Sequence, residues 1–145
     1  MNKTFLFLIL IFSLVVVKAQ TDTTLLPVKY TYPNGKVSSE GFLRDGKPDG
    51  YWKAYYETGL LKAEGNRKNF MLDGLWKFYS EEGTITQEIT YGEGLKNGIR
   101  RTFQKDETIE DYFVNDIREQ YTKVYFTDGK LKKIIPFSGG LENGT

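Results

Sequence analysis

The sequence contains no cysteine and no histidine among its 145 residues. Without cysteine the chain cannot form disulfides, and without both residue types it has no Cys/His zinc site. The absence of histidine also excludes a Ser-His-Asp triad and an imidazole general base. Any catalysis would have to rely on carboxylates, lysine or tyrosine, so we expect a non-enzymatic protein with no cofactor.

An excess of charge of one sign is also absent. The chain has 20 Lys and Arg residues against 19 Asp and Glu residues. Nucleic-acid-binding domains usually carry a strongly basic surface. The balanced charge therefore argues against nucleic acid as a partner.

Long hydrophobic runs are absent except at the N-terminus. Lys3 precedes an apolar run from Phe5 to Val17, and Ala19 provides the small residue at which a signal peptidase cuts. The run is shorter than the roughly 20 residues of a comfortable membrane span. We therefore predict a secretory signal peptide at residues 1–19, cleaved near Ala19-Gln20, and a secreted or periplasmic protein; an uncleaved anchor is the alternative. Loss of Lys3 and Lys18 would leave 18 basic and 19 acidic residues, a net charge of −1.

Glycine, in contrast, recurs at regular intervals. Gly35, Gly59 and Gly83 lie 24 residues apart, and a second series keeps the same spacing at Gly50, Gly74 and Gly98. A fixed period of this length indicates stacked supersecondary units. After the second-series glycines the sequence reads GYWKAY and then GLWKFY.

The segments between the glycines are short, aromatic and β-branched, and they lack helical spacing. They predict an all-β fold, an elongated, twisted single antiparallel sheet (a meander of about ten strands) over residues 28–145, after a leader segment at residues 20–27. The first strand is expected at Val28–Tyr32 and the last at Lys130–Pro136. We expect the first-series glycines in tight two-residue turns and the second series in longer turns. In the fourth unit Glu107 and Gln120 stand where glycines would be.

The segments Gly50–Leu61 and Gly74–Ile85 share the pattern Gly-x-Trp-Lys-x-Tyr, then Gly-x-Leu/Ile, closed by Asp/Asn-Gly. This pattern resembles the MORN repeat, in particular its bacterial variant, and is similar to the antitoxin-like proteins of the YwqK family. The resemblance covers about residues 30–144. It is weaker from Arg100 onward, where Arg100 and Thr122 stand in place of the tryptophan. It implies a twisted sheet of stacked MORN-like β-hairpins with an aromatic-lined face, and roles in protein or lipid contact.

The turns also predict which residues pair across the strands. A two-residue turn at Thr58-Gly59 places Lys53 opposite Glu64. Such pairs contribute about 0.2–1 kcal/mol each and would neutralise a basic row otherwise suited to phosphates. The same rule gives six further pairs: Lys77 with Glu88, Trp52 with Gly65, Trp76 with Ile89, Phe78 with Gln87, Arg101 with Tyr112, and Lys123 with Ile134. Since the last two cations face no carboxylate, any anion affinity is expected near the C-terminus.

The repeated aromatic positions are the candidate binding residues. Aromatic side chains are enriched where proteins meet partners, so we predict that the sheet binds another macromolecule, foremost a protein. An antitoxin or immunity-type protein that masks a toxin, a membrane-surface module and a structural envelope protein remain alternatives, and the oligomeric state stays open. The predicted contact or sheet-face residues are Tyr51, Trp52, Tyr55, Trp76, Phe78 and Tyr79.

Acidic residues near turns suggest two further possibilities. A carboxylate pair could support glycoside hydrolysis, and turn aspartates could hold Ca²⁺ weakly. Solvated turn residues are the simpler interpretation of both. The acidic residues concerned are Glu107, Glu110 and Asp111, the group Glu81, Glu82 and Glu88, and for calcium Asp45, Asp49 and Asp73.

Overall fold

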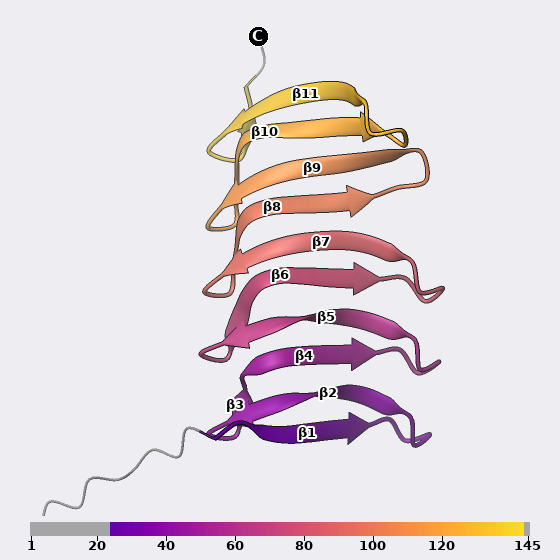
Figure 1. The fold of residues 1–145 in the computed structure, drawn as a ribbon. Helices are drawn as coiled ribbons and strands as arrows, with labels where there is room; N and C mark the ends of the chain where they lie inside the picture. The colour runs from indigo at the N-terminus through magenta and orange to yellow at the C-terminus, as the bar shows by residue number, and fades with distance from the viewer. Residues whose placement is uncertain (1–23, 144–145) are drawn as a thin grey trace, which may run out of the picture.

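The computed structural model describes residues 24–143, which form a single stack of β-hairpins (Figure 1). The predicted signal peptide and Gly144 lie outside these residues. No helix that could cross a membrane occurs within the described range.

In the part of the chain that the structure describes, twelve strands form one antiparallel sheet in which nearly every strand pairs with its neighbours in sequence. This confirms the predicted all-β meander of stacked hairpins. The strands are β1 (Leu26–Thr31), β2 (Val37–Arg44), β3 (Lys47–Pro48), β4 (Gly50–Tyr55), β5 (Leu61–Lys68), β6 (Met71–Tyr79), β7 (Ile85–Gly92), β8 (Leu95–Phe103), β9 (Glu107–Val114), β10 (Ile117–Phe126), β11 (Leu131–Ser138) and β12 (Leu141–Glu142).

The strand count exceeds the expected ten because two strands are only two residues long. Strand β3 pairs with β2 and is separated from β4 by Asp49 alone, and β12 pairs with the end of β11. Strand β1 begins at Leu26, two residues before the expected Val28, so the predicted leader overlaps it. The last long strand runs from Leu131 to Ser138 rather than from Lys130 to Pro136.

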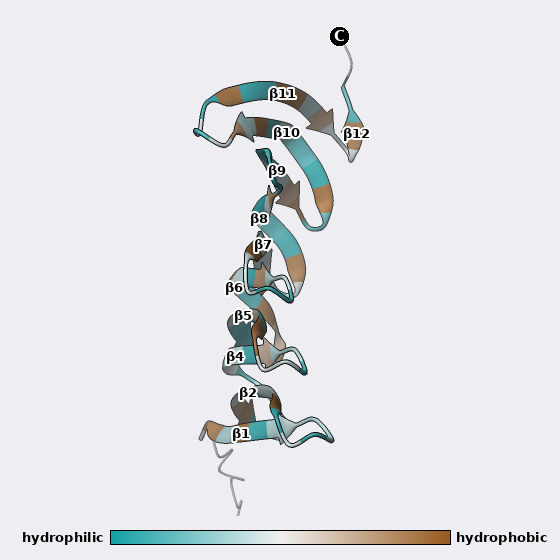
Figure 2. Ribbon diagram, turned by 90° about the vertical axis from the view of Figure 1, so that its right-hand side faces the viewer, coloured by the Kyte–Doolittle hydropathy of each residue, from teal (hydrophilic) through white to brown (hydrophobic). Residues whose placement is uncertain are grey.

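The sheet is one layer thick, as the side view shows (Figure 2). Within the described residues the buried apolar side chains are few. Because no second layer of described residues covers either face, many large apolar side chains stay in contact with solvent. The buried apolar residues are Ala63, Trp76, Ile89 and Phe113.

The first-series glycines do not form the expected two-residue turns. In the first hairpin the Gly35 N–H donates to Tyr32 O (2.9 Å) and the Tyr32 N–H donates to Lys36 O (2.8 Å). The loop therefore has three residues and ends in a left-handed glycine, with φ of 81° at Gly35 and 95° at Gly59. A type I turn closed by such a glycine is the usual three-residue hairpin loop.

The tight turns lie instead at the other ends of the hairpins. Asp45 and Gly46 have φ of 50° and 74°, the two positive values that define a two-residue type I′ turn. The expected assignment of tight and longer turns is therefore reversed. The corresponding turns in the later hairpins are Asn69-Phe70, Glu93-Gly94, Asn115-Asp116 and Gly139-Gly140.

The second-series glycines lie inside or at the start of strands, at irregularities in pairing. Gly74 has φ of 67°, and the register of β5 against β6 shifts between Glu64 and Asn66, close to it. Such β-bulges bend a strand and increase its twist. Gln120 takes the same position in the fourth unit with φ of 63°, which confirms that it replaces a glycine.

The predicted pairing is correct for most positions although the turn type is wrong. Lys53 pairs with Glu64 and Trp52 with Gly65. The register shifts by one residue between Ala54 and Tyr55, and this shift offsets the extra loop residue. The other confirmed pairs are Lys77 with Glu88, Trp76 with Ile89, Phe78 with Gln87, and Lys123 with Ile134.

The predicted pair of Arg101 with Tyr112 is wrong, because Arg101 pairs with Glu110. The hairpin between β8 and β9 closes through the Gln104 N–H, which donates to Glu107 O (2.9 Å), and its register shows no shift. It lacks both the loop glycine and the compensating bulge. Glu107 therefore begins β9 and does not replace a turn glycine.

Candidate binding surface

Alternation along the strands gives the sheet two chemically different faces. We call one the charged face, because a row of alternating cations and carboxylates crosses it from β1 to β10. The other is the tryptophan face, which carries Trp52 and Trp76. The charged row consists of Lys29, Glu40, Lys53, Glu64, Lys77, Glu88, Arg101, Glu110 and Lys123, each paired in register with the next.

Carboxylates alternate with the cations of the charged row, and ion pairs form at Lys29 and at Arg101. Lys29 Nζ lies 3.1 Å from Glu40 Oε2, and Arg101 contacts carboxylates on both sides, Glu110 at 3.0 Å and Glu88 at 3.7 Å. The expected free cation at Arg101 is therefore absent. The row therefore pairs opposite charges across the strands and does not form a continuous basic track.

Two of the predicted contact residues support this row. Tyr55 donates a hydrogen bond to Glu40 (2.6 Å), and Tyr79 donates one to Glu64 (2.7 Å). The hydrogen bond from Tyr79 is the main cause that holds the pKa of Glu64 below its ordinary value. Burial, followed by the bond to the carboxylate, raises the pKa of Tyr55 to about 12. Both hydroxyls are thus engaged within the sheet.

On the tryptophan face each indole covers a glycine of the preceding strand. A Cβ added to Gly65 would lie 2.4 Å from the Trp76 ring, and one added to Gly41 would lie 2.2 Å from the Trp52 ring. Trp52 pairs with Gly65 in the backbone register, but its ring leans the other way, onto Gly41. Trp76 is only 4% exposed and its Nε1 donates to Asn66 O (2.8 Å).

The predicted residues Trp52, Phe78 and Trp76 therefore form the sheet's own packing layer. Trp76 and Phe78 stack at a ring-centroid distance of 6.3 Å. Trp52 and Phe78 are partly exposed, whereas Trp76 is buried. A partner would reach Trp76 only if the sheet deformed, so we assign Trp76 to the sheet's packing.

Toward the C-terminus the tryptophan face becomes polar, as the loss of tryptophan at position 100 predicts. Asp111 is 1% exposed and accepts hydrogen bonds from Arg100 Nε (3.0 Å) and from the Thr122 hydroxyl. Arg118 Nε lies 3.3 Å from the same carboxylate. The two arginines that contact Asp111 come from different hairpins, and nothing in the repeat period indicates that they meet.

Exposed apolar side chains form a row on the charged face, beside the charges. Tyr51 is 48% exposed and Leu75 is 49% exposed, and Phe42 is also exposed. Phe42 is not among the predicted contact residues, because β2 lacks the tryptophan motif that marks the later units. Among the six predicted residues, Tyr51 is therefore the one that the structure exposes most clearly.

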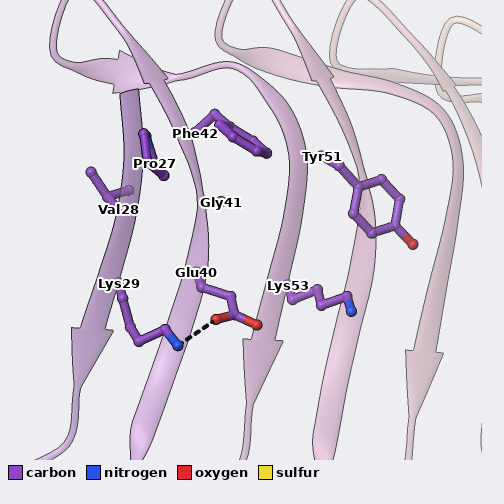
Figure 3. Close-up of a pocket in the computed structure, with 8 residues that line it drawn as sticks. All are labelled: Pro27, Val28, Lys29, Glu40, Gly41, Phe42, Tyr51 and Lys53. Atoms are coloured by element: carbon purple, nitrogen blue, oxygen red, sulfur yellow. Dashed lines mark ion pairs between the residues drawn. The ribbon is translucent and has the colours of Figure 1, made fainter. Parts of the chain in front are cut away.

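At the N-terminal end this row borders a groove of about 370 Å³. Phe42 and Tyr51 lie on one side of it, and Lys29, Glu40 and Lys53 lie in line across three strands (Figure 3). The groove opens where β4 pairs with β2 at only two positions, Ser39 with Ala54 and Glu40 with Lys53.

The candidate carboxylate pair does not assemble. Glu110 and Asp111 are neighbours in β9, so their side chains project to opposite faces, and each contacts an arginine. Glu107 pairs with Lys132 Nζ at 2.8 Å. No two of these carboxylates face each other across a cleft as glycoside hydrolysis requires.

The candidate calcium ligands are also separated. Asp49 accepts from Arg44 Nε (2.8 Å) and from the Gly50 N–H (2.9 Å). Asp45 lies in the adjacent type I′ turn, and Asp73 is in β6. Within residues 24–143 no cluster of three or more acidic residues suits a metal ion.

Comparison with protein families agrees with the repeat. Residues 48–69, 72–92 and 121–138 match the model of the MORN repeat variant. The unmatched stretch between 92 and 121 contains the shortened hairpin, yet the sheet continues through it. A search of curated proteins finds no match. Three segments of the chain thus match the MORN repeat variant, and they lie in one continuous sheet of hairpins.

Proposed function

We propose that this chain is an exported, non-enzymatic repeat protein that binds another protein through the exposed apolar row on its charged face. The main observation in support is the exposure of Phe42, Tyr51 and Leu75 on a sheet that, within residues 24–143, has no second layer. Exposed apolar rows rimmed by polar groups are typical of interaction sites. The matched MORN repeats are found in binding and structural proteins, which fits this role.

The neighbouring charges favour a protein over an anionic surface as the partner. The cations in the adjacent row alternate with carboxylates in register, and Arg101 contacts two of these carboxylates, so the row offers little net attraction to phosphates or acidic lipids. A protein partner could cover the apolar row and meet the paired charges at its rim, the arrangement common at protein interfaces.

An affinity pull-down tests this function. The full chain with a C-terminal tag is produced in its native cell, so that any signal peptide is processed there, and captured proteins are identified by mass spectrometry. We expect one dominant stoichiometric partner that is lost in the double variant Tyr51→Ser, Leu75→Ser. The matched control is Lys105→Ser, in the exposed β8–β9 loop.

Two results would contradict the proposal. Capture of background alone, combined with salt-sensitive binding to lipid vesicles, would indicate a membrane-surface role. Capture of a partner that the double variant still holds would place the contact elsewhere on the sheet. A captured toxin would turn the general role into an antitoxin or immunity function.

A further inference from the structure

Among the described residues, the charged row ends at strand β1, where Lys29 has a carboxylate on one side only. Every interior cation of the row lies between two carboxylates: Lys53 between Glu40 and Glu64, for example. Lys29 pairs with Glu40 on β2, and no described strand lies on its other side. Its side chain is 59% exposed. The row of five cations and four carboxylates thus ends in a cation on each side: Ile134 lies opposite Lys123 at one end, and no described residue lies opposite the outer side of Lys29 at the other.

An interior cation of the row shows how a cation contacts carboxylates on both neighbouring strands. Arg101 contacts Glu88 of the strand before it and Glu110 of the strand after it. One cation can thus hold carboxylates from both neighbouring strands. An added strand at the β1 edge would give Lys29 the same environment.

The groove beside Lys29 indicates that such a strand would also carry an apolar side chain. Pro27 and Phe42 line it on the same face as Lys29 (Figure 3). In an antiparallel pair, the residue two positions after the one opposite Lys29 lies opposite Pro27, again on this face. An apolar side chain at that position would enter the groove.

Strand β2 already combines a carboxylate in the charged row with an apolar residue two positions later. Glu40 pairs with Lys53, and Phe42, two residues later, lines the groove together with Tyr51. The sequence Glu40-Gly41-Phe42 is thus an internal example of the strand that the outer edge of β1 would accept.

A second copy of the chain cannot supply this strand from its long edge strands. The edge strand β1 reads LPVKYT and β11 reads LKKIIPFS, and neither contains an acidic residue. The outermost strand at the other end, β12, contains Glu142 but is only two residues long. At the β11 edge the row ends with Ile134 opposite Lys123, and β12 covers part of that edge. The open position therefore suits a strand from another protein.

We propose that the free edge of β1 binds an extended acidic segment of a partner protein as an added antiparallel strand. Its carboxylate lies opposite Lys29, and an apolar residue two positions later enters the groove at Pro27 and Phe42. This inference rests on the proposed protein-binding function and names the chemistry of the partner. Strand addition at a sheet edge is an established mode of peptide recognition, in which side-chain pockets give specificity.

The test uses a peptide with the sequence of residues 37–44, VSSEGFLR, labelled with a fluorophore, and a second peptide with Lys in place of its Glu. Fluorescence anisotropy measures the binding of both to the purified chain. Because cross-strand charge pairs change stability by up to about 1 kcal/mol, we expect the Glu peptide to bind about five-fold more tightly. Lys29→Glu should reverse this preference.

The matched control is Lys133→Glu at the opposite edge, which should leave both affinities unchanged. Absence of saturable binding, or a preference that Lys29→Glu leaves intact, would overturn the inference. Sedimentation showing that copies associate through β1 and compete with the peptide would overturn it as well. If the pull-down still captures a partner with Lys29→Glu, the proposed function stands and only the edge inference fails.

Discussion

The indole of Trp76 lies flat against Gly65 of the neighbouring strand, so closely that a Cβ at Gly65 would be 2.4 Å from the ring. The same relationship joins Trp52 to Gly41 one repeat earlier. In a single-layer sheet a large ring over a glycine shields backbone that no second layer covers. One repeat later Ile89 replaces the glycine, and in the same row Arg100 replaces the tryptophan.

Replacement of Gly65 by alanine should destabilise the protein. The added methyl group would force the Trp76 ring away, and overpacking of this kind costs about 1–3 kcal/mol. Urea unfolding measures the change. Gly92→Ala is the control, because a Cβ there meets Asn97 only at an ordinary 3.5 Å. Equal effects of the two variants would show that the ring contact is unimportant.

Trp76→Ala should be far more harmful to stability than Tyr51→Ala. Trp76 is buried and donates a hydrogen bond to Asn66 O, whereas Tyr51 is exposed. Removing a buried tryptophan costs about 3–5 kcal/mol, while exposed substitutions usually change stability by about 0.5 kcal/mol or less. Thermal melts of both variants distinguish them. A small effect at Trp76 would mean that it is not a packing residue.

Gln120→Gly should stabilise the protein. Gln120 has φ of 63°, a left-handed conformation that costs a non-glycine residue about 1–2 kcal/mol, partly offset by the flexibility of glycine in the unfolded chain. We expect a net gain of about 0.5–1 kcal/mol in the free energy of unfolding.

The reverse change, Gly74→Ala, should be destabilising by a similar amount. Gly74 has φ of 67°, and a Cβ added to it would meet no atom within 4 Å, so the substitution isolates the effect of backbone conformation. Urea unfolding of both variants measures the two changes. If both lower stability, the positive φ at this bulge is not the determining factor.

Stability should fall at both extremes of pH through the pair of Tyr79 and Glu64. The pKa of Glu64 is lowered in the folded state, chiefly by the bond from Tyr79, so its contribution is present above the ordinary 4.5 and is lost as the pH falls through the folded value. Burial, then the bond to Glu64, raises the pKa of Tyr79 from 10.0 to about 12. Its contribution is therefore lost as the pH rises from 10.0 toward about 12.

Tyr79→Phe should reduce both the loss of stability at low pH and the loss of stability at high pH. Near neutral pH it removes one partly exposed hydrogen bond, which contributes about 1 kcal/mol. Urea unfolding between about pH 3 and about pH 12, a range that spans the ordinary values of both groups, gives the difference from the wild type at each pH. The difference in the free energy of unfolding between Tyr79→Phe and the wild type should become smaller at both ends of the pH range. A constant difference across the range would exclude the coupling.

Much of the fold follows from short-range rules. The 24-residue period, the alternation along strands and the glycine positions predict an antiparallel meander, and they place Lys53 opposite Glu64 and Trp76 opposite Ile89. Register is well determined because a slip of one residue would exchange the two faces. The tight and three-residue turns lie opposite to where the sequence predicts them, since Asn-Gly suits a primed turn as well as a type I turn closed by glycine.

The sequence by itself determined the repeat, the sheet and most of the pairing, because these depend on residues close in the chain or related by the period. Only the tertiary structure decided that Trp52 leans onto Gly41, that Arg100 and Arg118 meet at Asp111, and that Tyr51 is exposed while Trp76 is buried. These outcomes depend on the direction in which a side chain leans and on which neighbouring strand it meets. That choice is set by bulges and loop lengths in adjacent hairpins, which local pattern does not encode.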